Sequence, residues 1–244
     1  MKIAFCFLTY DSIIRNDIWN TFFENISTDK YTVFIHPKKY NDNKIYDYTF
    51  TYNIVKERVY TKSKDDISIV KATLKLLEET YKYDNEITHF VFLTQSCIPL
   101  YNFDRLFDLI TKFDKSVISV IDHNKKERYT QLSPIMKKYI YYKNFVKQQP
   151  NMILIREDVR ILIHNDYTDH FTNMECPDEH YFINVMLSVF KKNIIKQQIN
   201  FCNNDFSKTQ ALEFKIVSND FINNIRNYGF LFMRKVDKNS VIIG

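Results

Sequence analysis

Glycine is almost absent from this chain of 244 residues, because only Gly229 and Gly244 occur. Dinucleotide-binding loops and Walker A loops both need several glycines close together. The sequence therefore excludes both kinds of glycine-rich loop. A bound phosphate group would have to be held by side chains, by a helix N-terminus or by non-glycine backbone.

Cysteines and long apolar runs are also scarce. Cys6, Cys97, Cys176 and Cys202 form no CxxC pair, and their spacing fits neither a zinc knuckle nor a dense disulfide framework. The longest apolar runs have the length of a strand, far below the ~20 residues of a membrane-spanning helix. The N-terminal apolar run is too short for a signal peptide. We therefore expect a cytoplasmic protein with no membrane-spanning segment.

The net charge is only +5, and lysines occur along the whole chain from Lys2 to Lys238. We interpret this charge as solvated surface charge, with an anionic small molecule as the next interpretation. No basic segment alternates with aromatic residues as in a recognised nucleic-acid motif, so no nucleic-acid partner is expected. With 45% hydrophobic and 26% charged residues, the chain is globular, and its length predicts one domain over residues 1–244.

Apolar periodicity predicts strands that alternate with helices. Buried strands are predicted at residues 2–8, 31–35 and 89–94, with further strands at 55–60, 117–121, 152–155 and 230–236. Helices are predicted at residues 11–25, 65–83, 103–113, 157–164, 176–192 and 219–226, and loops at 41–51 and 122–129. This alternation is typical of an α/β fold with a mainly parallel sheet, in which ligands bind at the carboxyl ends of the strands.

Four segments, in this order along the chain, resemble motifs of one family. They are HFVFLTQSCIPL (89–100), NKKERY (124–129), CPDEHYF (176–182) and FLFMRKV (230–236). The corresponding family motifs read SxSCIPL, NKEERW, PDEHYF and LFARKF. The chain therefore resembles the core-2/I-branching N-acetylglucosaminyltransferases and their plant and xylosyltransferase-like relatives.

This resemblance implies a GT-A type fold with a Rossmann-like, mainly parallel sheet. It also implies inverting transfer of a sugar from a UDP-sugar donor to a hydroxyl group of a glycan acceptor. GlcNAc is the first candidate for the transferred sugar. No divalent metal and no other cofactor is expected. The open alternatives are a UDP-xylose or UDP-glucose transferase, and a catalytically inactive glycan-binding domain. The family's KGSQWF is here residues 147–152, KQQPNM, and its IHVD is here residues 35–38, IHPK, without the aspartate.

Glu179 is the candidate catalytic base, because it matches the glutamate of the family's PDE motif. Inverting transfer needs a carboxylate that removes a proton from the acceptor hydroxyl. The sequence places Glu179 in the first turn of a helix after Pro177, where the helix dipole favours the charged form. From the local residues alone, an ordinary acidic first turn is the alternative. Asp178, Glu179 and His180 are not expected to hold a metal, because consecutive helix positions point apart.

The resemblance also implies a set of binding residues. Arg234 and Lys235 would neutralise the diphosphate of the donor, and Lys235 matches a basic residue of the family directly. The nucleotide pocket would be lined by Leu8, Tyr10 and His36. Acceptor contacts would come from Lys125, Arg128 and Ser96. For each of these, ordinary surface charge or strand-end packing is the alternative. The Asp65–Asp66 pair is interpreted as a helix cap rather than a metal motif.

Overall fold

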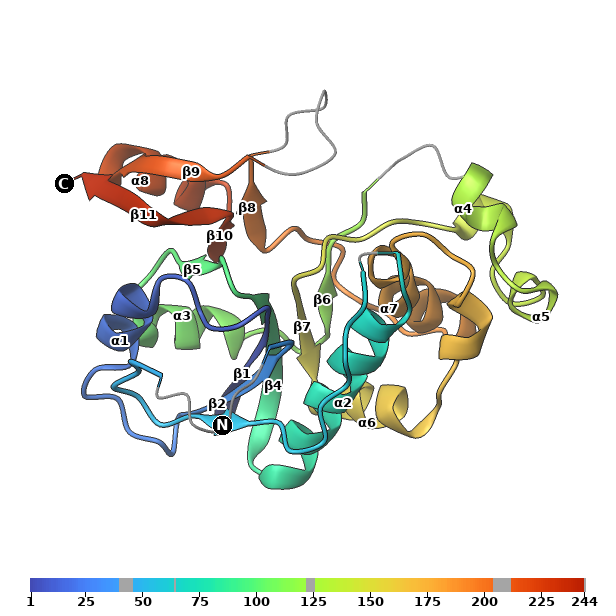
Figure 1. Cartoon of the computed structure of the whole chain (residues 1–244), viewed down its shortest axis with the longest axis horizontal. Helices are drawn as coiled ribbons and strands as arrows, with labels where there is room; N and C mark the ends of the chain where they lie inside the picture. The colour runs from blue at the N-terminus through green and yellow to red at the C-terminus, as the bar shows by residue number, and fades with distance from the viewer. Residues whose placement is uncertain (40–45, 64, 122–125, 204–211, 244) are drawn as a thin grey trace.

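The computed structural model describes residues 1–39, 46–63, 65–121, 126–203 and 212–243. Its centre is a six-stranded sheet with the strand order β3-β2-β1-β4-β7-β6 (Figure 1). The strands are β1 (Lys2–Thr9), β2 (Tyr31–Pro37), β3 (Asn53–Ile54), β4 (Ile87–Thr94), β6 (Val117–Ile118) and β7 (Met152–Ile155). β1, β2, β3 and β4 pair in parallel, whereas β7 runs antiparallel to both β4 and β6. The predicted mainly parallel sheet is therefore confirmed.

The central strand β1 is buried on both faces, as its continuous apolar sequence predicts. Phe5 and Phe7 point to one face and pack against α1 (Asn16–Phe23) and α3 (Phe103–Ile110). Ala4 and Cys6 point to the other face, which is covered by α2 (Ser68–Tyr83) and α6 (Arg156–His164). Figure 1 shows these helices as the two outer layers of the fold. Burying one phenylalanine side chain is worth about 1.5–3 kcal/mol, so each face contributes strongly to stability.

A second, smaller unit of structure comes from the C-terminal part of the chain. A three-stranded sheet consists of β5 (Ile98–Pro99), β10 (Phe232–Arg234) and β8 (Asn200–Cys202). A two-stranded sheet consists of β9 (Phe214–Ser218) and β11 (Val236–Ile243), and it packs with α8 (Asn219–Asn227). The sequence predicts one final strand at 230–236, but the chain forms β10 and then β11. Arg15 fastens β11 to the connection after β1, because its Nη1 donates to Ser240 Oγ (2.6 Å) and Ser240 O (3.1 Å).

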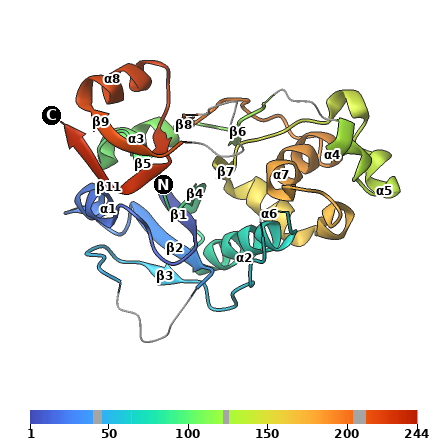
Figure 2. The same cartoon turned by 45° about the horizontal axis from the view of Figure 1, so that its top comes forward.

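The remaining helices are short. They are α4 (Lys126–Thr130), α5 (Pro134–Lys137), α7 (Tyr181–Asn184), the 3-10 turns η1 (Tyr142–Asn144), η2 (Thr168–Phe171) and η3 (Pro177–Glu179), and the π-helical turn η4 (Val185–Val189). The prediction of a loop over 122–129 is wrong for its last residues, which form α4. Figure 2 places α4 and α5 at the edge of the molecule opposite β11. Whether residues 1–244 form a single domain stays a prediction.

The predicted strand at 55–60 is wrong. β3 ends at Ile54, and Val55 N–H still donates to Ile35 O of β2 (3.0 Å), but three of the backbone N–H groups after it are satisfied by side chains. Lys56 and Glu57 donate to the carboxylate of Glu79 (2.8 and 3.0 Å), and Val59 donates to His36 Nε2 (3.0 Å). Partners of this kind, more than twenty residues away in the sequence, leave no apolar pattern that could identify them.

The predicted continuous helix over 176–192 is also wrong. Cys176 has a left-handed backbone (φ 50°), and His180 leaves helical geometry again (φ −130°, ψ −28°). The segment is therefore divided into η3, α7 and η4. Pro177 does occupy the first position of η3, as predicted, but Glu179 ends a single 3-10 turn rather than lying in the first turn of an α-helix. The helix-dipole argument for its charge does not apply.

Candidate functional site

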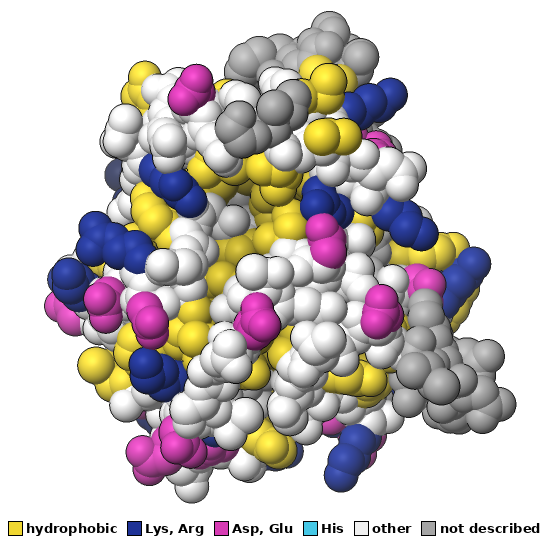
Figure 3. Space-filling model, turned by 90° about the vertical axis from the view of Figure 1, so that its left-hand side faces the viewer, with side chains coloured by type: hydrophobic (Ala, Val, Ile, Leu, Met, Phe, Trp, Pro, Cys, Tyr) yellow, Lys and Arg dark blue, Asp and Glu magenta, His cyan; other side chains and the backbone are white. Residues whose placement is uncertain are grey.

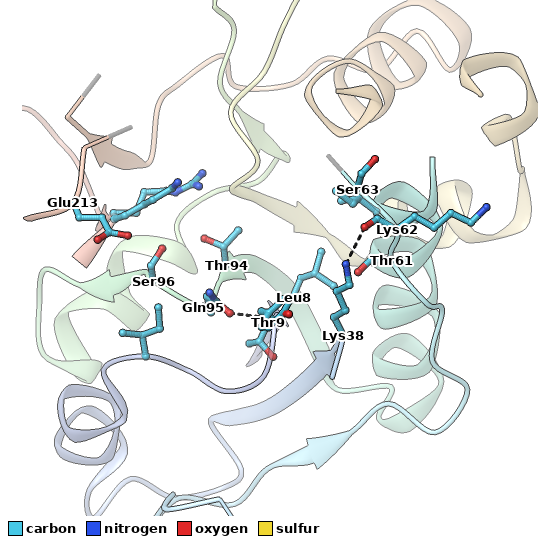
Figure 4. Close-up of a pocket in the computed structure, with 15 residues that line it drawn as sticks. Leu8, Thr9, Lys38, Thr61, Lys62, Ser63, Thr94, Gln95, Ser96 and Glu213 are labelled. Atoms are coloured by element: carbon cyan, nitrogen blue, oxygen red, sulfur yellow. Dashed lines mark hydrogen bonds between the residues drawn. The ribbon is translucent and has the colours of Figure 1, made fainter. Parts of the chain in front are cut away.

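A cavity of about 380 Å³ lies at the carboxyl ends of β1 and β4 (Figure 4). Its wall comes from the strand ends, from the segment that precedes α2 and from the C-terminal strands. The lining residues are Leu8, Thr9, Tyr10, Ile14, Lys38, Thr61, Lys62, Ser63, Ile69, Thr94, Gln95, Ser96, Glu213, Arg234 and Lys235. This is the position at which a mostly parallel sheet binds its ligand.

Gln95 holds the two central strand ends together. Its Oε1 accepts from the N–H of Tyr10 (2.6 Å), and its carbonyl accepts from the N–H of Ile14 (2.9 Å). These bonds fix the chain after β1 against the chain after β4, and they also explain why α1 begins only at Asn16. Figure 4 shows Gln95 at the floor of the cavity, between Thr94 and Thr9. Gln95 was not among the named site residues, but its position directly after β4 does place it at a strand end where ligands are expected.

Arg234 and Lys235 bring two positive charges to one side of the cavity. The backbone around them is fixed, because Val236 N–H donates to Ser96 O (3.0 Å) and Phe214 N–H donates to Lys235 O (2.7 Å). Burial, and then the neighbouring Arg234, lower the pKa of Lys235. Arg234 Nε is buried and has no hydrogen-bond partner among the described residues. A buried donor without a partner beside a second cation favours an anionic ligand.

Lys38 and Tyr10 form the opposite side of the cavity, beyond the ends of β1 and β2. Lys38 Nζ donates to the carbonyl of Lys62 (2.9 Å), which Figure 4 marks with a dashed line. The same ammonium lies 5.8 Å from the ring centroid of Tyr10 and 5.6 Å from that of Tyr60. Lys38 stands where the IHVD motif has its aspartate, so a cation replaces an anion on this wall.

Glu179 lies in the η3 turn, beside the segment that replaces KGSQWF. Its Oε2 is 2.8 Å from Lys147 Nζ, and its side chain is 28% exposed. Its carbonyl accepts from the N–H of Gln148 (2.8 Å), and its own N–H donates to Cys176 O (3.0 Å). The turn also contacts the approach to α2, because Cys176 Sγ donates to Asp65 Oδ1 (3.4 Å). Glu179 is thus held firmly, without being one of the lining residues of the cavity.

Asp178 links this turn to the cavity. Burial, and then the charge of Glu179, raise the pKa of its carboxyl to about 7, while Arg234 and Lys147 act in the opposite direction. Arg234 lines the cavity, so the carboxyl of Asp178 lies within the electrostatic field of the cavity wall.

The other predicted site residues divide into two groups. Leu8, Tyr10 and Ser96 line the cavity together with Arg234 and Lys235. His36 does not line it: its side chain is fully buried, its Nε2 accepts from Val59, and burial lowers its pKa to about 4.

Two acceptor-binding residues, Lys125 and Arg128, were predicted in the 124–129 segment. Arg128 does not line the cavity and forms an ion pair with Glu175. Lys125 lies outside the described residues. The role that the resemblance implies for either residue stays a prediction.

No group of three or more His, Cys, Asp or Glu side chains in the described part of the chain is arranged to hold a metal ion. Asp66 Oδ1 accepts from the N–H of Ser68, the first residue of α2 (2.8 Å), although the N-cap position itself is Ile67, which makes no side-chain cap bond. Among the residues that the structure describes, no helix is both long enough and apolar enough to span a bilayer.

Comparison with known proteins gives one relative by sequence. Glycosyltransferase BC10 from Oryza sativa subsp. japonica is 25% identical over 167 residues, which cover 68% of this chain. The matched region is 41% of the length of BC10, so the chain corresponds to less than half of that protein.

Similar solved structures share little sequence with the chain. Galactosyltransferase LgtC with donor and acceptor sugar analogues has a TM-score of 0.46 at 11% identity, over 82% of this chain and 75% of its own. The bifunctional glycosyltransferase WbbM has a TM-score of 0.39 at 9% identity, over 96% of this chain and 45% of its own. A 4-diphosphocytidyl-2C-methyl-D-erythritol synthase from Anaerococcus prevotii has a TM-score of 0.39 at 10% identity, over 80% of this chain and 87% of its own.

The family profile described as "Branch: Core-2/I-Branching enzyme" matches residues 3–226, which is nearly the whole chain. Together with the mostly parallel sheet and its flanking helices, this match confirms the α/β fold of GT-A type that the resemblance implies. The chain belongs to the core-2/I-branching enzyme family of glycosyltransferases.

Proposed function

We propose that the chain transfers a sugar from a UDP-sugar to a hydroxyl group of a glycan, with inversion at the anomeric carbon. The observation that carries this proposal is the pair Arg234 and Lys235, which lines a cavity at the strand ends, and the buried Nε of Arg234 has no hydrogen-bond partner within the described part of the chain. A nucleoside diphosphate is an anion of the size and charge that such a pair would bind.

Glu179 is the proposed general base. An ionised carboxylate next to Lys147 can take the proton of an acceptor hydroxyl as that oxygen attacks the sugar. The transfer then breaks the bond between the anomeric carbon and the diphosphate oxygen, and the leaving UDP carries the bonding electrons. Arg234 and Lys235 would stabilise the charge that develops on UDP, so we expect no requirement for a divalent metal.

GlcNAc is the first candidate for the transferred sugar, followed by xylose and glucose. The cavity wall does not follow the family pattern at Lys38, which replaces the aspartate of IHVD. Donor choice is therefore best tested with UDP-GlcNAc, UDP-xylose and UDP-glucose in parallel. We propose that Ser96 contacts the sugar or acceptor from the cavity wall and that Lys125 and Arg128 contact the acceptor. A cytoplasmic location stays a prediction.

The decisive experiment compares Glu179→Gln with the wild type. We expect sugar transfer to fall by about 10²–10⁴-fold, the usual contribution of a general base, while UDP affinity measured by calorimetry stays the same. Glu157→Gln is the matched control, because Glu157 is paired with Arg160 on α6 outside the cavity. Transfer that survives in Glu179→Gln would exclude this residue as the base.

Two further measurements test the other parts of the proposal. Activity that EDTA removes and Mn²⁺ restores would contradict metal-independent transfer. A wild-type protein that binds glycans but binds no UDP would favour the inactive glycan-binding domain instead. The anomeric configuration of the product, measured by NMR, would distinguish inversion from retention.

A further inference from the structure

Residues 126–144 form a projecting lobe made of α4, α5 and η1, which we call the α4–α5 lobe. Figures 1 and 2 both show α4 and α5 at one extreme edge of the molecule, away from the C-terminal sheet. The lobe is anchored from below, because Met136, Ile140 and Phe145 are completely buried in the main core. These buried side chains hold the lobe in place, so its outer surface has a fixed position on the molecule.

The α4–α5 lobe carries most of the net charge of the protein. It contains one acidic residue, Glu127, and five basic ones, a net charge of +4, whereas the whole chain has +5. The basic residues are Lys126, Arg128, Lys137, Lys138 and Lys143. No Asp or Glu occurs between Glu127 and Glu157. The basic residues that occur along the whole chain are therefore densest in this lobe.

Acidic residues from neighbouring elements do not cancel this charge fully. Glu175 forms an ion pair with Arg128, and Asp169, on the η2 turn beside the lobe, lies 3.8 Å from Lys71. Figure 3 shows the opposite side of the molecule, where basic and acidic side chains are interspersed. The positive charge is therefore concentrated at one end.

The same lobe exposes large apolar and aromatic side chains. Ile135, Tyr139, Tyr141 and Tyr142 are between 47% and 58% exposed. Tyrosine is enriched where proteins meet the headgroup level of a bilayer, because its ring is apolar and its hydroxyl is polar. Lysines beside such side chains are attracted to anionic headgroups, each by about 1 kcal/mol.

We propose that the α4–α5 lobe docks the protein onto the surface of an anionic lipid bilayer. The lobe projects outward, so it can press Ile135 and the tyrosines into a flat headgroup layer, with Lys138 and Lys143 against the lipid phosphates. The proposal goes beyond sugar transfer and does not depend on the role of Glu179. It describes a peripheral attachment and involves no membrane-spanning segment.

The test is co-sedimentation of the full chain with vesicles. We expect binding to vesicles of phosphatidylcholine with 30 mol% phosphatidylglycerol, roughly a composition at which electrostatic attachment is strong at low salt. Vesicles of phosphatidylcholine alone should bind much less, and 0.5 M NaCl should release the protein. The double variant Lys138→Gln/Lys143→Gln should bind at least about tenfold more weakly, and so should Tyr139→Ser/Tyr141→Ser.

The matched control is Tyr228→Ser/Lys238→Gln, which removes an exposed tyrosine and an exposed lysine at the C-terminal end of the molecule. We expect wild-type binding for this control, and thermal unfolding verifies that all variants are folded. Equal binding by lobe and control variants, or equal binding to neutral vesicles, would overturn the proposal. So would preferential, lobe-dependent binding of poly(U), because the lobe would then be a nucleic-acid surface.

Discussion

Lys147 Nζ lies 2.8 Å from Glu179 Oε2, and the two side chains are 30% and 28% exposed. The backbone on both sides of this contact is also fixed, because Lys147 O accepts from Ile121 N–H (2.8 Å) and Gln148 N–H donates to Glu179 O (2.8 Å). Side-chain pair and backbone bonds together give the proposed base one defined orientation.

Lys147→Met should therefore reduce sugar transfer by about tenfold or more, since a base that loses its orientation loses part of its contribution. Lys147→Arg should restore much of the activity, because it keeps the positive charge. UDP affinity should not change in either variant, since Lys147 does not line the cavity. Initial rates and calorimetry on the same preparations measure both effects. A loss of UDP binding in Lys147→Met would show that the residue acts on the donor instead.

Arg234→Gln and Lys235→Gln should each weaken UDP binding by roughly 10- to 100-fold, because a hydrogen bond to a charged group contributes about 1.5–3 kcal/mol. Lys215→Gln is the control, since this exposed lysine lies on β9 in the same part of the molecule but not in the cavity. Isothermal calorimetry gives the affinities. If all three variants bind UDP as the wild type does, the diphosphate does not lie at β10.

Asp178 should make stability depend on pH. Its pKa rises from the ordinary 3.8 to about 7, so between these values the folded protein holds a proton that the unfolded chain releases. The free energy of unfolding then falls as the pH increases from about 4 to 7. Asp178→Asn removes this dependence. The free energy of unfolding of this variant should therefore exceed that of the wild type by the largest amount near pH 8. The expected difference is no more than about 4 kcal/mol, because one pKa unit corresponds to about 1.4 kcal/mol.

Urea unfolding at pH 5, 6.5 and 8 measures this effect. Asp169→Asn is the control, because Asp169 is 90% exposed and should give parallel curves. A constant difference between Asp178→Asn and the wild type at all three pH values would contradict a raised pKa.

Trp19, the only tryptophan in the chain, supports the site from beneath. It is fully buried against Phe5 and Phe7, and its Nε1 donates to Cys97 O (3.0 Å), one residue after Ser96. Trp19→Phe should destabilise the fold by about 2–4 kcal/mol, because it leaves a cavity and an unpaired carbonyl. Circular dichroism during urea unfolding gives the change. Tyr228→Phe, at an exposed position, should stay within about 0.5 kcal/mol of the wild type.

Elements whose causes are local could be predicted from the sequence. β1, β2 and β4 follow from continuous apolar runs, and α3 begins where Asn102 accepts from Arg105 N–H (3.1 Å), a cap within four residues. The strand-end position of the site follows from the same pattern. Leu8, Tyr10 and Ser96 line the cavity because the strand ends of a parallel sheet meet at one edge. Arg234 and Lys235 reach the same cavity from the end of β10 in the second sheet, and only the resemblance to the family predicted them.

Contacts between distant segments could not be predicted. The pairing of Lys147 with Glu179 and the burial of His36 against Val59 depend on how separate loops pack, and no periodicity records this. The late start of α1 has the same origin, because Ile13 N–H donates to Tyr48 Oη (2.8 Å) from another part of the chain.

The bonds from Arg15 to Ser240 join positions 225 residues apart. During synthesis, Arg15 leaves the ribosome long before Ser240. Their contact can form only after β11 has also left the ribosome. Arg234 and Lys235 directly precede β11, so a nascent chain can form its central sheet well before it has the cationic side of the cavity. The cavity is therefore completed later than the sheet that supports it.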